Sequence, residues 1–318
     1  MFYSIRHVTR HRYDAPVRES EMQLYMQPKS DGSQRLQSFQ VATHPRAGLQ
    51  AYTDHFGNAV YHFDVPGEHQ ELTVEADAEV EVMAMPAPPE WVDGSAWQAL
   101  ASPQLRSENY DMLAPHGMAR VTPALTAFLT EHNLNKTEDP MTTLRRLNRV
   151  LFDAFAYSPD TTEVDSPIDV ALEKRAGVCQ DFAHIMITTA RSWGIPARYI
   201  SGYLYTKRDA GDRSAADATH AWVEALVPGV GWVGLDPTNN VLTGERHIRV
   251  AIGRDYDDVP PSRGVFKGPA NGELAVAVRV TPAQAPRRRD DFLRVVRPLT
   301  NTVERHDGGG ADAQQQQQ

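Results

Sequence analysis

The spacing of apolar residues changes along this chain from every second residue to about every 3.6 residues, and this change most constrains its fold. Leu72–Val82 alternates apolar and polar residues, which is typical of a strand with one buried face. After the proline-rich segment Pro86–Pro89, Pro140–Phe155 carries its leucines on one face of a helix. We therefore expect a β-rich part followed by a part in which helices pack on strands.

Two domains and a tail are expected. Residues 1–86 should form a small β-rich domain, whose other strands are Phe2–Thr9, Phe39–Thr43 and Ala59–Val65. Residues 87–300 should form an α+β domain with helices at Pro123–His132, Pro140–Phe155 and Gln180–Trp193, and strands at Ala197–Tyr205, Ala221–Val227, Trp232–Asp236 and Leu274–Val280. The last of these strands could return to the first sheet and tie the two parts together. Residues 301–318 lack large apolar side chains and should form a disordered tail.

The charge balance and the single cysteine exclude several classes of protein. Lys and Arg total 32 against 41 for Asp and Glu, so phosphate attraction to nucleic acid is not expected. One cysteine leaves no intramolecular disulfide and no multi-cysteine zinc site. No apolar run approaches about 18 residues, and the N-terminus carries charges where a signal peptide needs an apolar run. We therefore expect a cytoplasmic protein that needs no cofactor. We also expect it to bind neither nucleic acid nor membranes.

The only cysteine, Cys179, stands at the start of the helix expected over Gln180–Trp193. A thiol at a helix N-terminus lies near unpaired backbone N–H groups and the positive end of the helix dipole, which favours the reactive thiolate. The alternative is an inert core residue, because free cysteines are usually buried. Position alone therefore makes Cys179 a candidate nucleophile.

His220 and Asp236 supply the other two groups that a thiol nucleophile needs. His220 opens one expected strand, Asp236 ends the next, and Pro228–Gly231 between them has the composition of a hairpin. The two strands should then be antiparallel neighbours. An Asp that accepts a hydrogen bond from the imidazole orients it, and the imidazole activates the thiol. Taken singly, a surface His and a capping Asp are commoner explanations.

Several segments resemble the transglutaminase-like superfamily. Gly177–His184 and Gly194–Tyr203 are similar to its nucleophile helix and following strand, while His220–Glu224 and Gly231–Asn239 are similar to its histidine and aspartate segments. The N-terminal part resembles the bacterial transglutaminase-like N-terminal domain at His7, Thr9, Tyr13, Pro16, Ser20 and Asp54–Asn58. Gly253–Gly264 resembles a further segment of this bacterial group, so the resemblance covers nearly the whole chain apart from the tail.

The resemblance implies a papain-like core in which a thiol on a helix faces His and Asp on a sheet. Such enzymes cleave or exchange amide bonds through a thioester. The backbone N–H of Cys179 is the first expected donor to the oxyanion. Candidates for further oxyanion or substrate contacts are Gln180, Tyr157, Arg254 and Asp255. Gln180 is expected to point elsewhere on the helix, and solvated loop charges are the simpler reading of the last two.

Other polar residues have simpler structural explanations. Asp181 lies in the first helical turn, where its charge suits the helix dipole. His184 follows Cys179 by five residues, which turns it away from the thiol. Arg198 is expected to pair with an acid in the core, and Arg263 to be solvated. A metal site from Cys179, His184, His220 and Asp236 lacks a supporting ligand spacing.

Three functions remain open. A cysteine protease or amidohydrolase acting on a peptide or protein amide is favoured, because bacterial relatives are generally described as cysteine proteases. A transglutaminase-type acyltransferase would pass the same acyl group to an amine. A non-catalytic binding scaffold is the third, and the intact set Cys179, His220 and Asp236 argues against it. The oligomeric state and the substrate are not indicated by the sequence.

Overall fold

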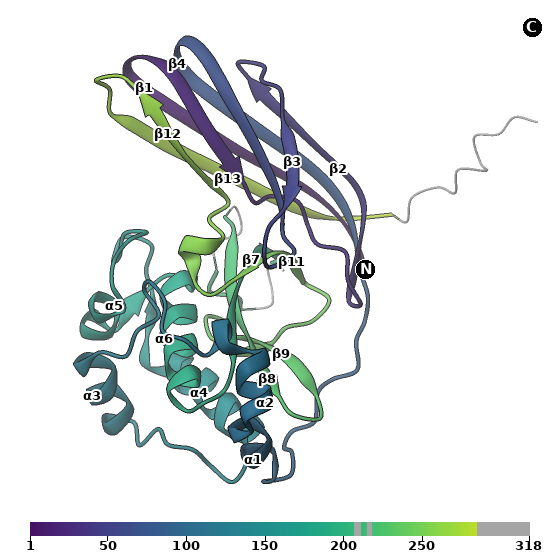
Figure 1. Cartoon of the computed structure of the whole chain (residues 1–318), viewed down its shortest axis with the longest axis vertical. Helices are drawn as coiled ribbons and strands as arrows, with labels where there is room; N and C mark the ends of the chain where they lie inside the picture. The colour runs from purple at the N-terminus through teal and green to yellow at the C-terminus, as the bar shows by residue number, and fades with distance from the viewer. Residues whose placement is uncertain (207–210, 215–217, 285–318) are drawn as a thin grey trace, which may run out of the picture. The chain divides into compact units, whose positions relative to one another are not determined.

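A long antiparallel strand pair forms the centre of the first sheet in this computed structural model, which describes residues 1–206, 211–214 and 218–284. β1 (Phe2–Leu24) pairs with β4 (Ala59–Val82) along most of its length (Figure 1). β2 (Gln34–His44) and β3 (Gln50–Thr53) pair with β4. The predicted alternation is confirmed, because every even-numbered residue of Leu72–Val82 is buried.

The expectation that Ala59–Val65 and Leu72–Val82 are separate strands is wrong, because the single strand β4 includes both. The register between β1 and β4 is irregular between Arg12 and Glu19 of β1, and Pro66 lies opposite Glu19. A bulge accommodates proline, which has no N–H to donate to the ladder. Pro66 therefore marks an irregularity within a strand and not its end.

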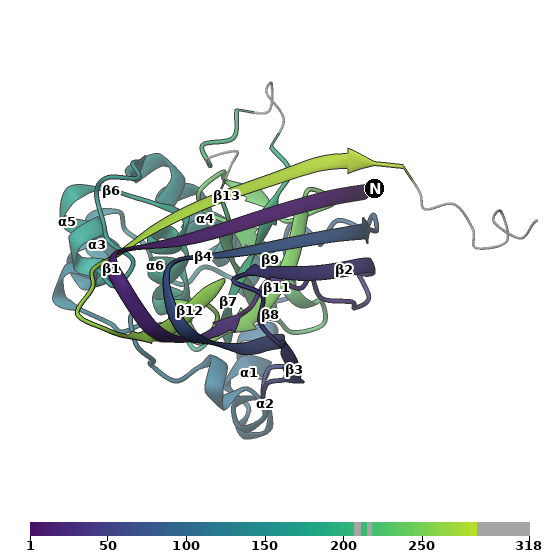
Figure 2. The same ribbon diagram turned by 90° about the horizontal axis from the view of Figure 1, so that it is seen from above.

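Two strands from late in the sequence complete the first sheet. β12 (Ser262–Lys267) pairs with the second half of β1, and β13 (Gly272–Ala283) pairs with its first half. Figure 2 shows β13 running beside β1. The return of Leu274–Val280 to the N-terminal sheet, left open by the sequence, is therefore the arrangement found. The domain boundaries at residues 86 and 300 stay a prediction, and the expected tail at 301–318 lies outside the described residues.

The middle of the chain contains the helices. They are α1 (Ala96–Ala101), α2 (Pro103–Glu108), α3 (Pro123–Glu131), α4 (Pro140–Ala154), α5 (Ile168–Lys174) and α6 (Cys179–Ser192), with short 3₁₀ turns η1 (Tyr110–Met112) and η2 (Tyr256–Asp258). Thr122 and Asp139 cap α3 and α4 by accepting backbone N–H groups, and each helix then begins with proline. The leucine face predicted for α4 is buried.

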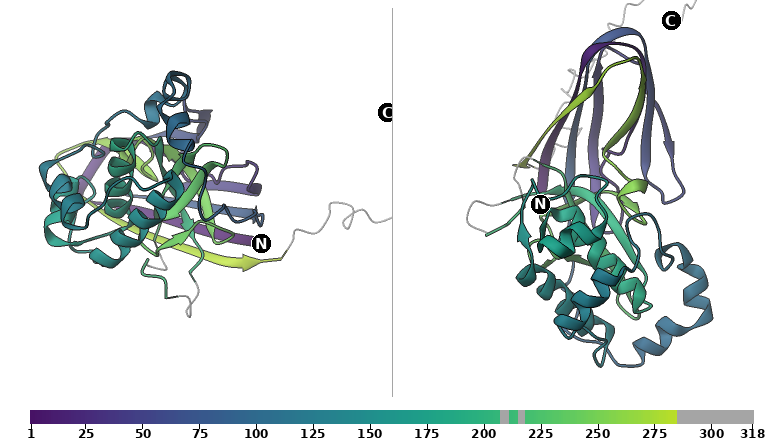
Figure 3. Two further views of the ribbon diagram at one scale, coloured as in Figure 1. Left: turned by 90° about the horizontal axis from the view of Figure 1, so that it is seen from below. Right: turned by 90° about the vertical axis from the view of Figure 1, so that its left-hand side faces the viewer.

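The second sheet is antiparallel and carries the helices. Its strands lie in the order β10 (Val241–Leu242), β9 (Gly231–Asp236), β8 (His220–Val227), β7 (Ala197–Leu204) and β11 (His247–Gly253). α6 contacts β7 and β8, and α4 contacts α6. Figure 3 shows the blue and teal helices beside the green strands from two further sides. This helix-on-sheet arrangement confirms the predicted α+β fold.

Buried hydrogen bonds join the first sheet to the second. His7 Nδ1 lies 2.9 Å from the Tyr203 hydroxyl. Asn58 donates to the Ile252 carbonyl at 2.8 Å and accepts the Ile252 backbone N–H at 2.8 Å. Residues Met1–Gln284 accordingly form one compact unit. In the part of the chain that the structure describes, no helix is long and apolar enough to cross a membrane.

Candidate active site

Cys179 is the first residue of α6, and the Asp181 side chain holds the start of this helix. The Asp181 carboxylate accepts the Val178 backbone N–H at 2.8 Å and the Thr162 hydroxyl at 2.6 Å. Gly177 leaves room for the carboxylate, because a Cβ there would lie 2.5 Å from Asp181 Oδ2. These contacts place the Cys179 side chain at a helix N-terminus, where backbone N–H groups lack intrahelical partners.

The rest of α6 anchors the thiol. Every residue from Asp181 to Arg191 is buried, whereas Cys179 is half-buried. The helix is therefore held on its sides by packing, while its first residue remains accessible to a reactant. A thiol with this exposure differs from the inert core cysteine that was the alternative explanation.

His220 lies at the start of β8 with one ring nitrogen committed to Asp236. Its Nε2 donates to Asp236 Oδ2 at 2.8 Å, and its Nδ1 lies 3.3 Å from the Ser214 hydroxyl. Burial would lower the pKa of His220, but the Asp236 charge and hydrogen bond, together with the Cys179 side chain, outweigh burial and raise it to about 10. Since Nε2 faces Asp236, Nδ1 is the nitrogen left for the thiol.

Asp236 is completely buried at the end of β9. Its Oδ2 accepts from His220 Nε2, from His247 Nε2 at 3.1 Å and from Asn239 Nδ2 at 2.7 Å. Its Oδ1 accepts the backbone N–H groups of Thr238 and Asn239 at 3.0 and 3.2 Å. Burial alone would raise the pKa of Asp236, but the His220 charge and these donors hold it well below its usual range. The side chain is therefore a carboxylate that can orient an imidazolium.

Sequence reasoning missed three polar residues at this centre, namely His247, Asn239 and Ser214. Asn239 donates both to Asp236 and, at 3.0 Å, to the Ser214 hydroxyl. Its position three residues after Asp236 is a spacing typical of a turn that caps a carboxylate, so a local signal existed. No local signal pointed to His247, because its position depends on the pairing of β11 with the distant β7.

Gln180 and Tyr157 lie on the nucleophile side of the site. The Gln180 side-chain amide donates to the Val164 carbonyl at 2.7 Å, so it braces a neighbouring loop. Tyr157 is in β5 (Ala156–Tyr157), which pairs in parallel with β6 (Ala176–Gly177) and places Tyr157 opposite Gly177, two residues before Cys179. Tyr157 is therefore adjacent to the nucleophile segment, as the sequence hypothesis required, and its role as an oxyanion donor stays a prediction.

Arg254 and Asp255 are separated from His220 along β7. They follow Gly253, which pairs with Tyr199, whereas His220 pairs with Gly202 three positions further along β7. Three residues of strand correspond to roughly 10 Å. Both side chains have other partners: Asp258 binds the Arg254 guanidinium, and His116 Nδ1 lies 2.9 Å from Asp255 Oδ2. Tyr199 lies within electrostatic range of both Cys179 and Asp255, and a contact of Arg254 or Asp255 with substrate stays a prediction.

Three other residues that the sequence analysis weighed, His184, Arg198 and Arg263, make structural contacts. Burial lowers the pKa of His184 to about 4, and its Nε2 accepts the Tyr256 backbone N–H at 3.2 Å. Arg198 donates to the buried Glu224 at 2.8 and 2.5 Å. Arg263 donates to Gln23 in β1. His184 is therefore neutral and occupied, which makes it unsuitable as the base.

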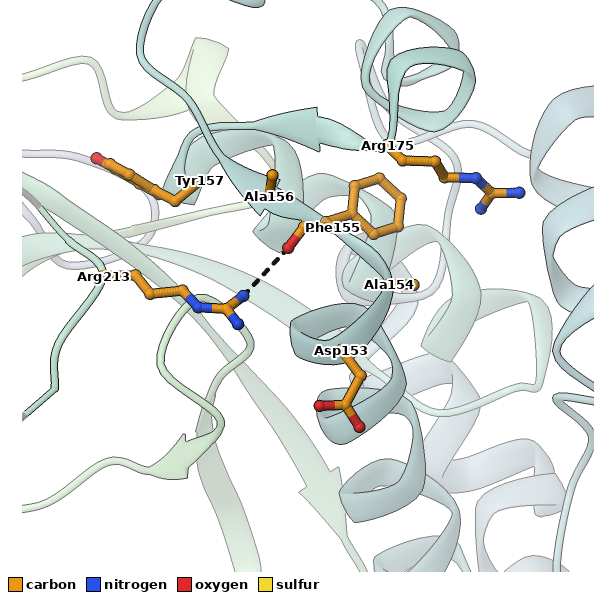
Figure 4. Close-up of a pocket in the computed structure, with 7 residues that line it drawn as sticks. All are labelled: Asp153, Ala154, Phe155, Ala156, Tyr157, Arg175 and Arg213. Atoms are coloured by element: carbon orange, nitrogen blue, oxygen red, sulfur yellow. Dashed lines mark hydrogen bonds between the residues drawn. The ribbon is translucent and has the colours of Figure 1, made fainter.

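A hollow of about 680 Å³ borders the nucleophile side of the site. It is lined by Asp153, Ala154, Phe155, Ala156, Tyr157, Arg175 and Arg213. Figure 4 shows Arg213 directed at the Phe155 carbonyl, to which it donates at 3.1 Å. Ser214, which follows Arg213 along the chain, contacts His220, whereas Cys179, His220 and Asp236 are not among the residues that line this hollow.

One cluster could in principle hold a metal at this centre. His220, Asp236 and His247 bring their ligand atoms within 4.8 Å of one another. Both Nε2 atoms lie at hydrogen-bonding distance from Asp236 Oδ2, and His247 Nδ1 accepts the Gly244 backbone N–H at 3.3 Å. Each imidazole is thus accounted for as an N–H donor to the carboxylate, and we assign the cluster to this hydrogen-bond network.

Comparisons with known proteins cover both parts of the chain. Residues 3–81 match the bacterial transglutaminase-like N-terminal region, and residues 129–237 match the transglutaminase-like superfamily. An uncharacterised protein of Mycobacterium leprae is 34% identical over 276 residues, which cover 86% of this chain and 96% of that protein. A protein-glutamine gamma-glutamyltransferase of Pseudomonas aeruginosa is 33% identical over 133 residues, 39% of this chain and 20% of that protein.

The fold has a counterpart among solved structures. A candidate cysteine protease from Cytophaga hutchinsonii has a TM-score of 0.68 and 18% identity, covering 90% of this chain and 92% of that one. The long match to the mycobacterial relative and the two regional matches agree with the order of segments found here. This chain belongs to the transglutaminase-like superfamily.

Proposed function

We propose that this protein cleaves amide bonds through a thioester, with Cys179 as nucleophile, His220 as general base and acid, and Asp236 as the group that orients His220. The observation that carries the proposal is the orientation of His220. Its Nε2 is held by the buried Asp236 carboxylate at 2.8 Å, which leaves Nδ1 for the thiol at the start of α6, and the Cys179 side chain helps to raise the pKa of His220. These side chains would supply the nucleophile, the base and the orienting acid that the proposed reaction needs.

The acylation half of the reaction begins with a proton transfer from the Cys179 thiol to His220 Nδ1. The sulfur then attacks the amide carbonyl carbon, and the backbone N–H of Cys179 stabilises the negative oxygen. His220 Nδ1–H returns the proton to the amide nitrogen, the C–N bond breaks, and the amine leaves. The acyl group remains on sulfur as a thioester.

The deacylation half decides between the two candidate chemistries. If water attacks the thioester, His220 takes its proton, the acid is released, and the reaction is hydrolysis. If an amine attacks instead, the product is a new amide. The peptidase or amidohydrolase is favoured by the overall likeness to a candidate cysteine protease. Acyl transfer is the second candidate, favoured by the regional similarity to a protein-glutamine gamma-glutamyltransferase.

The experiment that tests the proposal mixes the purified protein with a peptide library, with and without an added primary amine. Mass spectrometry then follows the peptides. New fragments, or a mass gain equal to water minus ammonia as side-chain amides become acids, identify hydrolysis, whereas a mass gain equal to the amine minus ammonia identifies transfer. The Cys179→Ala variant is the matched control.

The outcomes are distinct. We expect Cys179→Ala and His220→Ala each to abolish nearly all turnover, with no further loss in the double variant, because the two residues act as one unit. Turnover that persists in Cys179→Ala would overturn the proposal. A wild-type protein that changes no peptide under either condition would favour the non-catalytic scaffold.

A further inference from the structure

Two imidazoles share one carboxylate oxygen at the candidate site. His220 Nε2 and His247 Nε2 lie 2.8 and 3.1 Å from the same Asp236 Oδ2. Both histidines and Asp236 are buried. The proposed reaction uses only the His220–Asp236 pair, so the second histidine needs an explanation of its own.

His247 is a neutral donor. Its Nδ1 accepts the Gly244 backbone N–H at 3.3 Å, so its single ring proton is on Nε2 and points at Asp236. Burial lowers the pKa of His247 despite the nearby carboxylate, which is consistent with this neutral form. The contact is therefore a hydrogen bond to an anion rather than a second ion pair.

The surroundings hold His247 in this orientation. Its ring packs edge-on against Trp222 with ring centres 5.2 Å apart, and Trp222 also lies beside His220. The charged and titratable groups that act on it are Asp236 from β9, His220 from β8 and Arg246 beside it. Arg246 is itself paired with Asp212 at 2.6 and 3.2 Å. The His247 Nε2 proton is therefore donated to Asp236 Oδ2.

We propose that His247 is a positioning residue for the amide-cleaving reaction. Its N–H restrains the Asp236 carboxylate and takes up part of its negative charge, which limits how strongly Asp236 holds the proton of His220. This inference rests on the proposed function for its catalytic meaning, while the restraint on Asp236 can be measured without any substrate.

The proton transfers of the proposed reaction explain why the strength of the His220–Asp236 ion pair matters. When the tetrahedral intermediate collapses, His220 Nδ1–H passes its proton to the leaving nitrogen as the C–N bond breaks. An imidazolium that Asp236 stabilises too strongly gives up this proton less readily. A second donor on Asp236 therefore aids the collapse while leaving the ion pair intact. Trp222 and Gly244 fix the direction of that donor.

The test compares His247→Phe with His247→Gln in the full-length protein. Phe keeps a ring against Trp222 and removes the N–H, whereas Gln keeps an N–H that reaches the position of Nε2. The first measurement is an ¹⁵N NMR titration of His220. We expect its pKa to rise by about half a unit or more in His247→Phe, and to stay near the wild-type value in His247→Gln.

The second measurement is turnover, with thermal unfolding as the control for folding. We expect kcat to fall about tenfold in His247→Phe with KM nearly unchanged, and to recover in His247→Gln. An unchanged His220 titration in a folded His247→Phe protein would overturn the proposal. So would equal losses in both variants that follow their thermal stability, since a merely structural role predicts that pattern. If His247→Phe does not fold, the Gln variant and His247→Asn, whose shorter amide cannot reach Asp236, provide the same contrast.

The two proposals can fail separately. A wild-type protein without turnover, or one that remains active as Cys179→Ala, contradicts the proposed function, yet the NMR titration still decides whether His247 acts on the His220–Asp236 pair. Turnover that depends on Cys179 together with an unaltered His220 titration contradicts only the role of His247.

Discussion

Replacing Asp236 by Asn should destabilise the protein, and it should do so in a pH-dependent way. The described residues give the Asp236 carboxylate five hydrogen-bond donors, three at Oδ2 and two at Oδ1. An Asn side chain has a single acceptor oxygen. Its NH₂ group must therefore face N–H donors at one of the two positions, and buried donors lose their partner.

The size of the effect follows from these contacts. Each buried donor left unsatisfied costs about 1–3 kcal/mol. If the Asn oxygen keeps the three donors at Oδ2, two backbone N–H groups remain unsatisfied, which costs about 2–6 kcal/mol. The His220 ion pair is lost as well: at 1.36 kcal/mol per pKa unit, the difference between 6.5 and about 10 corresponds to about 5 kcal/mol as an upper bound. These costs overlap, so we expect a loss of about 3–6 kcal/mol at pH 6.

The pH dependence provides the sharper check. Because the pKa of His220 is raised in the folded state, its stabilisation is fully present below about pH 6.5 and is lost as pH rises through about 10. The lowered pKa of Asp236 adds stabilisation that is present above its ordinary value of 3.8 and is lost as pH falls. Urea unfolding of both proteins at pH 6 and pH 10 should therefore show a larger difference at pH 6. A difference below about 1 kcal/mol at pH 6, or one equal at both pH values, would refute this reasoning.

Two further perturbations test the supports of the site. Gly177→Ala would place a Cβ 2.5 Å from Asp181 Oδ2 and displace the carboxylate that holds the start of α6. We expect the free energy of unfolding in urea to fall by about 1–3 kcal/mol and the alkylation of Cys179 to become slower. The control Gly48→Ala, with open space around its Cβ, should resemble wild type. Removing residues 272–318 deletes β13 and exposes the edge of β1. Relative to a chain ending at residue 284, we expect this truncated chain to have a lower Tm and to aggregate in size-exclusion chromatography. Equal behaviour of the two truncated chains would show that β13 is dispensable.

The candidate triad could be predicted from sequence because its geometry is local. His220 and Asp236 are joined by a short hairpin, and the antiparallel pairing of β8 with β9 brings them together much as the turn residues indicated. Cys179 stood at the start of a helix with a clear apolar face, so its placement at a helix N-terminus needed no long-range information. Only the packing of α6 against this sheet had to be supplied by the family resemblance.

Contacts between distant segments could not be predicted in this way. His247 reaches Asp236 because β11 pairs with β7, and β11 was not recognised as a strand. Ala59–Val65 and Leu72–Val82 were expected as separate strands, although pairing with β1 carries β4 through Pro66 with an irregular register. Arg254 and Asp255 were candidates for substrate contact, with solvated loop charges as the simpler explanation, and strand register places them at the Tyr199 end of β7, three positions from the partner of His220. In each case pairing between remote strands decided the outcome, and the local composition does not encode that pairing.

The central claim is that His220 activates Cys179. The most direct test measures the rate at which iodoacetamide alkylates Cys179 from pH 4 to pH 10, in the wild-type protein and in His220→Ala. Since His220 takes the thiol proton, the wild-type protein should react rapidly at pH 6, and its rate should change little as pH rises further. In His220→Ala the rate at pH 6 should fall on the order of 100-fold and then climb with pH, because the thiol no longer has a base to take its proton. Identical profiles for the two proteins, or labelling that requires denaturant, would contradict the account.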